Sequence, residues 1–511
     1  MSSILLQFPP APRRSHMTIF EQDGQMKDIP ESVLGPVVTT PEYPEIFVQT
    51  ESASHLNVRY ESAQLAFLSH NQASWKRPLH AWYNGGLLNM FEELSQAKPE
   101  VPGWLSSTCK AALSVLELLK SLRVTLFSQP ALSNEELLLK YSHVSDWHKS
   151  PVQAITWHPH VIKVAIALRD DSVHIYYSGT SLQPILKHKL QKQVTDLAWQ
   201  PLSSSVLAVA CQTCILIWNV EPTSLAVRPS ASTVQILQYS SHSPVTSLSW
   251  SPFGDHLISA CPKQASILVW DVPKETYVSL KRSGGGGISY LSYSPDGSKL
   301  FTASTSPIFR VWESKNWNWE NWANLSGHCT TACWSPDSTV LIFAMEKEPS
   351  LFGVRFVESG RGNALSAVNT SVLLADVSQV SLSSGLSEDV RVGGQVKSIV
   401  WDETGERVAV MFQPNDLGNN HLVAVFKSTI HPVLELVPGG FVKGRSGESA
   451  HHIAFLPGFQ NGALLSIVWS SGRVGYVPMF FLPAQQIQHY NTIGFGPFSS
   501  VLSPKDSMFR K

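Results

Sequence analysis

The sequence has almost no excess of charge. Its 511 residues include 38 Lys and Arg against 39 Asp and Glu, a formal net charge of −1, and charged residues make up 15% of the chain, against about 25% in typical soluble proteins. The densest basic groups, Arg13-Arg14 and Arg510-Lys511, are pairs at opposite ends. Because strong binding to a polyphosphate needs many clustered basic side chains, we expect no direct nucleic acid partner.

Cysteines and long apolar runs are also scarce. Six cysteines are too few for the disulfide framework of a secreted protein, so we expect reduced thiols. The first apolar run breaks at Pro9 and follows no basic residues, which is unlike a secretory signal peptide. No apolar stretch reaches the roughly 18 residues that a spanning helix needs. We therefore expect the protein to reach a membrane only through a partner.

One sequence pattern recurs from residue 152 onward. Each copy begins with an apolar residue, reaches an aromatic residue about five positions later, often continues into Pro, and then holds two apolar runs. The repeat aromatics are Trp157, Trp199, Trp250, Tyr293, Trp334, Trp401 and Phe455. The copies over residues 152–480 average about 47 residues, close to the roughly 40–45 residues of a four-stranded propeller blade. The repeat predicts a mainly β fold, a seven-bladed WD40-type β-propeller.

The first apolar run of each copy supports this fold. Runs such as Val164–Leu168 and Val206–Ala210 are continuously apolar and do not alternate with polar residues. Such a pattern is typical of a strand that is covered on both faces. Neighbouring blades of a propeller provide this cover.

The remaining segments are assigned around the repeats. We predict an extended N-terminal arm over 1–75, a helical region packed on the propeller over 76–148, the propeller over 149–483 and a C-terminal tail over 484–511. Residues 357–394 are rich in Ser, Gly and Val and widen the spacing between the fifth and sixth copies. They predict a long surface loop.

The helical region shows three apolar periodicities. Residues 87–94 and 112–126 place apolar side chains on one side of a helix. Ser133–Glu136 fits a capping box and predicts a third short helix through Tyr141. A helix that packs on the propeller and a free helix that binds a partner are both open.

Ring closure requires a strand that the last copy does not supply. The seventh copy lacks an outer strand after Phe481, and an unpaired strand edge would be reactive. Residues 17–22 are the best candidate for that strand, so we expect the N-terminal arm to close the ring.

The sequence contains no recognisable catalytic constellation. Cys211 and Cys214 have the spacing of a zinc half-site, but a closed site needs two further ligands, so we interpret them as buried small side chains. His158–His160 and His451–His452 do not fit a metalloprotease helix and are interpreted as turn and strand-end residues. Phosphate-binding loops and nucleophile elbows are also missing. We predict no catalytic residue, no cofactor and no metal.

Three tryptophans crowd the outer strand after the fourth copy. Trp317, Trp319 and Trp322 lie within six residues. Tryptophan is favoured as an anchor in protein interfaces, but packing between blades also uses aromatic side chains. A protein interface and inter-blade packing both remain open for these residues.

Several longer runs carry a family resemblance. The most distinctive are Asp170–Tyr176, Val206–Trp218, Ser294–Lys299, Phe309–Glu313 and Trp469–Arg473. In these runs, and over most of residues 1–490, the sequence resembles the aladin family of WD-repeat nucleoporins. The resemblance implies a structural component of the nuclear pore complex at the nuclear envelope. It also implies that other nucleoporins, especially a transmembrane nucleoporin, hold the protein there, and that it supports nucleocytoplasmic transport.

Two other functions are weighed against this one. A soluble WD-repeat adaptor, such as a ubiquitin-ligase substrate receptor or a coat subunit, would use the same rigid platform. A propeller hydrolase would place an acid or a histidine in its central funnel, but the sequence shows no paired carboxylates and no nucleophile motif for it.

Overall fold

A computed structural model shows how the chain folds. It describes residues 3–13, 15–22, 24–31, 46–48, 108, 132–144, 150–177, 183–220, 229–230, 234–239, 241–281, 286–356, 371–383, 389–414, 422–460 and 462–481. The chain forms two compact units, of which the first comprises Met1–Thr50 and Glu136–Lys511 and the second Glu51–Glu135. The propeller and the strands of the N-terminal segment lie in the first unit.

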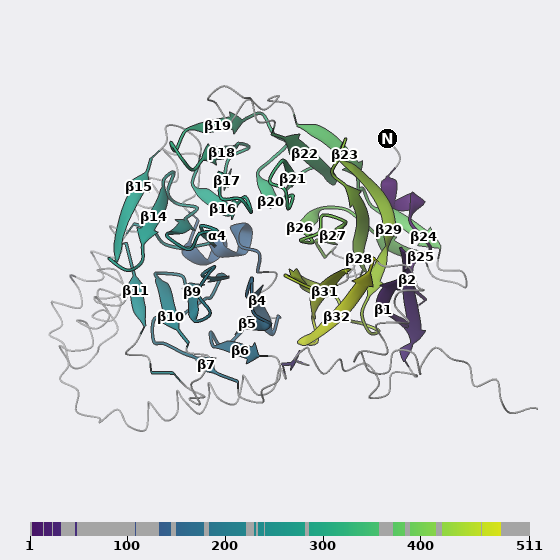
Figure 1. Ribbon diagram of the computed structural model, residues 1–511, viewed down its shortest axis with the longest axis horizontal. Helices are drawn as coiled ribbons and strands as arrows, with labels where there is room; N and C mark the ends of the chain where they lie inside the picture. The colour runs from purple at the N-terminus through teal and green to yellow at the C-terminus, as the bar shows by residue number, and fades with distance from the viewer. Residues whose placement is uncertain are drawn as a thin grey trace, which may run out of the picture. The chain divides into compact units, whose positions relative to one another are not determined.

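Seven sheets make up the propeller, as the repeat predicted (Figure 1). Blade 1 comprises β4 (Val152–Trp157), β5 (Lys163–Leu168), β6 (Val173–Tyr177) and β7 (Ile185–Leu186). Blade 2 comprises β8 (Asp196–Trp199), β9 (Val206–Ala210), β10 (Ile215–Asn219) and β11 (Gln235–Leu237). Blade 3 comprises β12 (Ser247–Trp250), β13 (Leu257–Ala260), β14 (Ile267–Asp271) and β15 (Thr276–Leu280). Blade 4 comprises β16 (Ile288–Tyr293), β17 (Lys299–Ser304), β18 (Phe309–Glu313) and β19 (Trp319–Trp322). Blade 5 comprises β20 (Cys329–Trp334), β21 (Val340–Met345), β22 (Ser350–Arg355) and β23 (Val372–Asp376). Blade 6 comprises β26 (Val396–Trp401), β27 (Arg407–Phe412), β28 (Leu422–Thr429) and β29 (Glu435–Lys443). Blade 7 is built on β30 (Ala450–Leu456), β31 (Gly462–Trp469) and β32 (Arg473–Phe480). The predicted mainly β, seven-bladed fold is confirmed.

The continuously apolar runs are the second strands of the blades. Every residue of β5, β21 and β27 is buried. Core clusters join side chains of adjacent blades, for example Val173 of blade 1 with Leu207 of blade 2. Each second strand is therefore covered on both faces, which explains why its sequence does not alternate.

Four of the five repeat tryptophans connect a blade to the one before it, whereas Trp401 donates to Ser428 Oγ within blade 6. The indole Nε1 of Trp250 in blade 3 donates a hydrogen bond to the Ala198 carbonyl of blade 2 at 3.1 Å. Trp157 in blade 1 donates to Ser466 Oγ in blade 7 at 2.8 Å, so an indole hydrogen bond of the same kind also joins the first blade to the last. Bonds to the preceding blade are also made by Trp199 and Trp334. The repeated position thus serves both packing and hydrogen bonding.

The N-terminal segment adds strands to blade 7. β1 (His16–Gln22) runs parallel to β32, with Glu21 opposite Met479. β2 (Gln25–Pro30) pairs antiparallel with β1, and β3 (Ile46–Phe47) pairs antiparallel with the start of β32. The edge of β32 is therefore paired by residues from the other end of the chain (Figure 1).

A short 3₁₀ helix precedes these strands. η1 (Ile4–Gln7) contacts β23 and β29, the outer strands of blades 5 and 6, and Leu5 is fully buried there. Phe8 stacks on Phe441 at 4.6 Å and meets Phe426 edge-on at 5.0 Å. The expected extended arm over 1–75 is thus corrected for its described part, which is a helical turn followed by a hairpin, because its apolar side chains pack against three blades.

The expected loop over 357–394 is also corrected. Three strands lie in it: β23, which completes blade 5, and β24 (Val380–Ser383) and β25 (Asp389–Val392), which form a separate hairpin. The buried positions are Ala375, Val377 and Val392, with Val380, Leu382 and Val390 partly buried, and the surrounding Ser and Gly residues obscure this pattern in the sequence. Residues 357–370 and 384–388 lie outside the described residues.

The third predicted helix is present. α4 (Asn134–Tyr141) buries Leu137 and Leu138. The helices predicted at 87–94 and 112–126, and the tail over 484–511, lie outside the described residues. Among the helices that are described, none is long and apolar enough to cross a membrane.

Candidate protein-interaction site

Exposed apolar side chains gather on one face of the propeller. They occupy the hairpins between the first and second strands of blades 1 to 3. Val161 and Ile162 are about 40% exposed, Leu202 is 74% exposed and Phe253 is 67% exposed. Because the same hairpin of each blade lies at the same end of the propeller axis, these four residues share one face. We call them the apolar arc.

Hydrogen bonds between neighbouring hairpins hold the apolar arc in place. His158 Nε2 lies 2.9 Å from the Ser203 carbonyl, while its Nδ1 accepts the Val161 amide at 3.1 Å. Since Nδ1 accepts, Nε2 carries the proton and donates to blade 2. Burial lowers the pKa of His158, which favours the neutral ring. Gln200 Nε2 then donates to the Gly254 carbonyl of blade 3 at 2.6 Å.

The apolar arc replaces a polar turn that other blades retain. The third position after the repeat aromatic is Leu202 or Phe253 in blades 2 and 3, but Asp296 in blade 4. The Asp296 carboxylate accepts bonds from Ser294 Oγ at 2.6 Å and from the Ser298 amide at 3.1 Å, so it stabilises its own turn. Leu202 makes no such bond and has a φ of 63°, which is uncommon for a side chain of this kind. The backbone conformation of Leu202 is costly for its turn, and the apolar side chains are exposed. Both observations favour binding as the role of these residues.

The apolar arc was not predicted from the sequence. Its signal is a large apolar residue directly after the repeat proline, as in Pro201-Leu202 and Pro252-Phe253. A turn position normally favours Asp, Asn, Ser or Gly. The deviation is visible only when the seven repeats are aligned on their aromatic residues.

The three predicted interface tryptophans have separate environments. Trp322 is 5% exposed and stacks on Phe309 at 5.0 Å, so it belongs to the core between blades 4 and 5. Trp317 is half-buried beside His256. Trp319 is 39% exposed on β19. Of the two alternatives, inter-blade packing is therefore the one that the structure favours for Trp322, and the interface remains a prediction for the other two.

The cysteine pair lies in the core between blades 1 and 2. Cys211 and Cys214 flank the β9–β10 hairpin and are buried among apolar side chains. Burial raises the pKa of the Cys211 thiol, which disfavours the thiolate that a metal needs. Within the described ranges no three His, Cys, Asp or Glu side chains are grouped to hold a metal ion.

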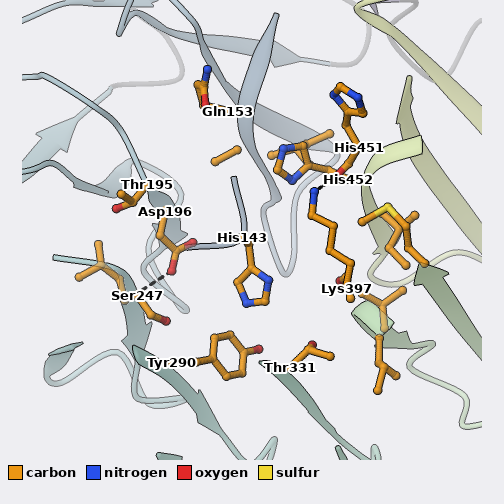
Figure 2. A pocket seen from close by; sticks show the side chains of 18 of the residues that line it. His143, Gln153, Thr195, Asp196, Ser247, Tyr290, Thr331, Lys397, His451 and His452 are labelled. Atoms are coloured by element: carbon orange, nitrogen blue, oxygen red, sulfur yellow. Dashed lines mark hydrogen bonds between the residues drawn. The ribbon is translucent and has the colours of Figure 1, made fainter. Parts of the chain in front are cut away.

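The central channel contains a cavity of about 260 Å³ (Figure 2). The first strand of every blade contributes to its wall, and His143, just after α4, reaches into it. His451 and His452, predicted as strand-end residues, lie on β30 and line the same cavity. Lys397 and His143 were not predicted from the sequence, because residues from different blades are brought together only by the ring.

The channel does not present the carboxylate pair of a glycoside hydrolase. Asp196 is the one carboxylate among the described residues that line the cavity. Its oxygens accept the backbone amides of Leu197 and Leu248, each at 2.8 Å, and burial raises its pKa to about 6. Such hydrolases place two carboxyl groups about 5–10 Å apart.

Comparison with known proteins agrees with this fold. A family model described as the aladin seven-bladed propeller matches residues 133–480. Aladin of Arabidopsis thaliana is 29% identical over 354 residues, which cover 65% of this chain and 76% of that protein. The APC/C activator protein CDH1 of Saccharomyces cerevisiae is 24% identical over 171 residues, covering 32% and 28% of the two chains. A chain in a crystal structure of the mitotic checkpoint complex has 16% identity and a TM-score of 0.47, with 65% of this chain and 90% of that chain covered. Since the family model spans all seven blades and α4, this chain belongs to the aladin family of seven-bladed propellers.

Proposed function

We propose that this protein is a non-enzymatic structural component of the nuclear pore complex, docked at the nuclear envelope through a transmembrane nucleoporin. Membership of the aladin family is the observation that carries the proposal. In this role the propeller is a platform for other nucleoporins and supports nucleocytoplasmic transport. Contact with the membrane is then made by the partner and not by this chain.

The apolar arc supports a docking role. Val161, Leu202 and Phe253 present apolar side chains from hairpins that are bonded to one another, so little conformational freedom is lost when a partner binds. Rigid aromatic and aliphatic anchors are the residues that dominate protein interfaces. We place a nucleoporin contact on this face.

Localisation of the tagged full chain tests both statements. We expect a signal at the nuclear rim, and loss of that signal in the double variant Leu202→Asp/Phe253→Asp, because a buried unpaired charge opposes docking. Val278→Asp is the matched control, since Val278 is 62% exposed on β15 and lies outside the apolar arc. A wild-type protein that stays diffuse in the cytosol contradicts the nucleoporin function. Rim signal in the double variant contradicts only the docking face.

A soluble WD-repeat adaptor is the second candidate. The partial match to an APC/C activator favours it, although that match covers 32% of the chain. Affinity purification from cells, followed by mass spectrometry, separates the two functions. Nucleoporins as the main partners support the first, and ubiquitin-ligase or coat subunits support the second.

A further inference from the structure

Basic side chains from several elements meet in the central channel. Lys397 on β26, His452 on β30 and His143 after α4 line one cavity (Figure 2). They lie close enough to repel each other when protonated: the charge of Lys397 lowers the pKa of both His143 and His452. Such repulsion is strong where water is excluded.

Among the described residues, none of these basic groups is paired directly with a carboxylate. Asp196 is the one carboxylate in the described lining, and its oxygens are occupied by the backbone amides of Leu197 and Leu248. Burial is the cause that lowers the pKa of Lys397 to about 7. A carboxylate beside the ammonium would have the opposite effect. Lys397 is therefore the positively charged member of the cluster near pH 6.5, because burial lowers the pKa of His143 to about 4 and that of His452 well below its usual value.

Several hydrogen-bond donors of this cluster are unused. Lys397 Nζ donates to the His451 carbonyl at 3.4 Å, which leaves two of its three N–H groups. The His143 ring meets Tyr290 edge-on at 4.9 Å, and its nitrogens have no hydrogen-bond partner in the part of the chain that the structure describes. His452 donates to the Val152 backbone, so its Nε2, which is buried and lacks a partner among the same residues, is the acceptor of the neutral ring and not a further donor. Unpaired buried polar groups are costly.

We propose that the central channel is an anion-binding site, in which Lys397 and His143 donate hydrogen bonds to a small oxyanion of the phosphate or carboxylate type. The anion supplies the negative charge that Lys397 lacks beside it and accepts the unused donors. The cavity of about 260 Å³ is just below the roughly 300–1,000 Å³ of sites for drug-sized ligands, so it suits a small ion or a single anionic group. Charge-assisted bonds of this kind are among the strong ones in proteins.

Binding at this site depends on pH with a definite sign. The titratable groups that face the cavity are His143, Asp196, Tyr290, Lys397, His451 and His452. Lys397, with a pKa of about 7, is charged below that pH and neutral above it. Asp196, with a pKa of about 6, adds an opposing charge above that value. Both changes weaken anion binding as the pH rises.

Calorimetric titration of the full chain with sulfate tests the proposal, because sulfate keeps the same charge over this pH range. We expect saturable binding near pH 6.5 and affinity about tenfold weaker near pH 8.5. Titration with acetate at the same ionic strength distinguishes a carboxylate from a tetrahedral anion. The absence of saturable binding with both anions overturns the proposal.

Two variants assign the binding to the channel. Lys397→Met keeps the length of the side chain and removes its charge, and we expect it to weaken sulfate binding by about 10–100-fold. Lys274→Met is the matched control, because the Lys274 side chain is 75% exposed on the outside of blade 3; its affinity should stay within about twofold. Equal affinities in the two variants overturn the site.

Hydrogen exchange on the wild type keeps the test independent of variant folding. Sulfate should slow amide exchange in β26 and β30, which carry Lys397 and His452. Protection confined to other blades contradicts the proposal. Sulfate also stabilises proteins by exclusion from their surface, and that general effect would not favour these two strands.

Discussion

A buried ion pair links the N-terminal segment to blade 6. Glu21 on β1 and Arg407 on β27 meet at 2.8 Å, with side chains 1% and 8% exposed. Arg407 Nε also lies 3.1 Å from both carboxylate oxygens, and its guanidinium stands over the Phe481 ring at 4.4 Å. The pair is bidentate and desolvated, so each partner depends on the other.

Loss of the Glu21 charge should therefore be costly. We expect Glu21→Gln to lower the free energy of unfolding by about 3–5 kcal/mol, because it leaves Arg407 charged and buried. Denaturant unfolding followed by tryptophan fluorescence measures this. Glu406→Gln is the control: Glu406 touches the same guanidinium at 3.7 Å but is 54% exposed, so its loss should cost below about 1 kcal/mol. Equal effects of the two substitutions would show that burial of the pair contributes nothing.

Local and long-range residue roles differ in how far the sequence reveals them. The repeat aromatics were found from spacing alone, and Trp250 and Trp157 do connect adjacent blades. Glu21 and Arg407 are 386 residues apart, and no periodicity relates them. The same holds for Lys397 and His143, whose proximity depends on the closed ring.

At the scale of elements, the N-terminal segment crosses three blades. η1 packs on the outer strands of blades 5 and 6, Thr18 on β1 donates to the Phe441 carbonyl of blade 6 at 3.4 Å, and β1 pairs with β32 of blade 7. Glu31 then accepts the Ser446 amide at 2.7 Å. The segment bonds blade 6 to blade 7, where the ring would otherwise have an unpaired strand edge.

Stepwise truncation tests the closing role of this segment. Removal of residues 1–8 takes away η1 and Phe8, and removal of residues 1–30 also takes away β1 and β2. We expect both to lower the melting temperature and only the second to cause aggregation, because it alone exposes the edge of β32. Differential scanning calorimetry with light scattering measures both effects. A chain without residues 1–30 that melts at the wild-type temperature would show that the closing strand is unnecessary.

The segment over 357–394 shows why elements are harder to predict than folds. β23 is five residues long and β24 and β25 are four each. Strands this short give too few alternating positions to stand out among Ser and Gly residues. They are stabilised by pairing and by contacts with η1, which lies more than 360 residues away in the sequence.

At the scale of the molecule, the ring is closed twice. The Trp157 indole joins blade 1 to blade 7, and a core cluster that contains Val164 of blade 1 and Leu464 of blade 7 joins the same two blades. Core clusters run from each blade into the next. A single backbone cut should therefore leave the fragments held together.

Limited trypsin digestion tests this closure. The Ser- and Gly-rich sequence over 357–394 predicts the first cleavage within this range, and Arg361 lies between two glycines there. We expect a first cut after Arg361, with both fragments co-eluting from a native sizing column. Arg310 on β18 is 3% exposed and should resist. Fragments that separate without denaturant would contradict the double closure.

The sequence by itself determined the number of blades, the strands covered on both faces and the positions of the repeat aromatics, because each of these depends on a local pattern that repeats. Only the tertiary structure decided which residues meet across the ring: Glu21 with Arg407, η1 with blades 5 and 6, and the basic cluster around Lys397. Those contacts join residues that no repeat relates, and their energies depend on burial, which exists only after the blades have closed around a common axis.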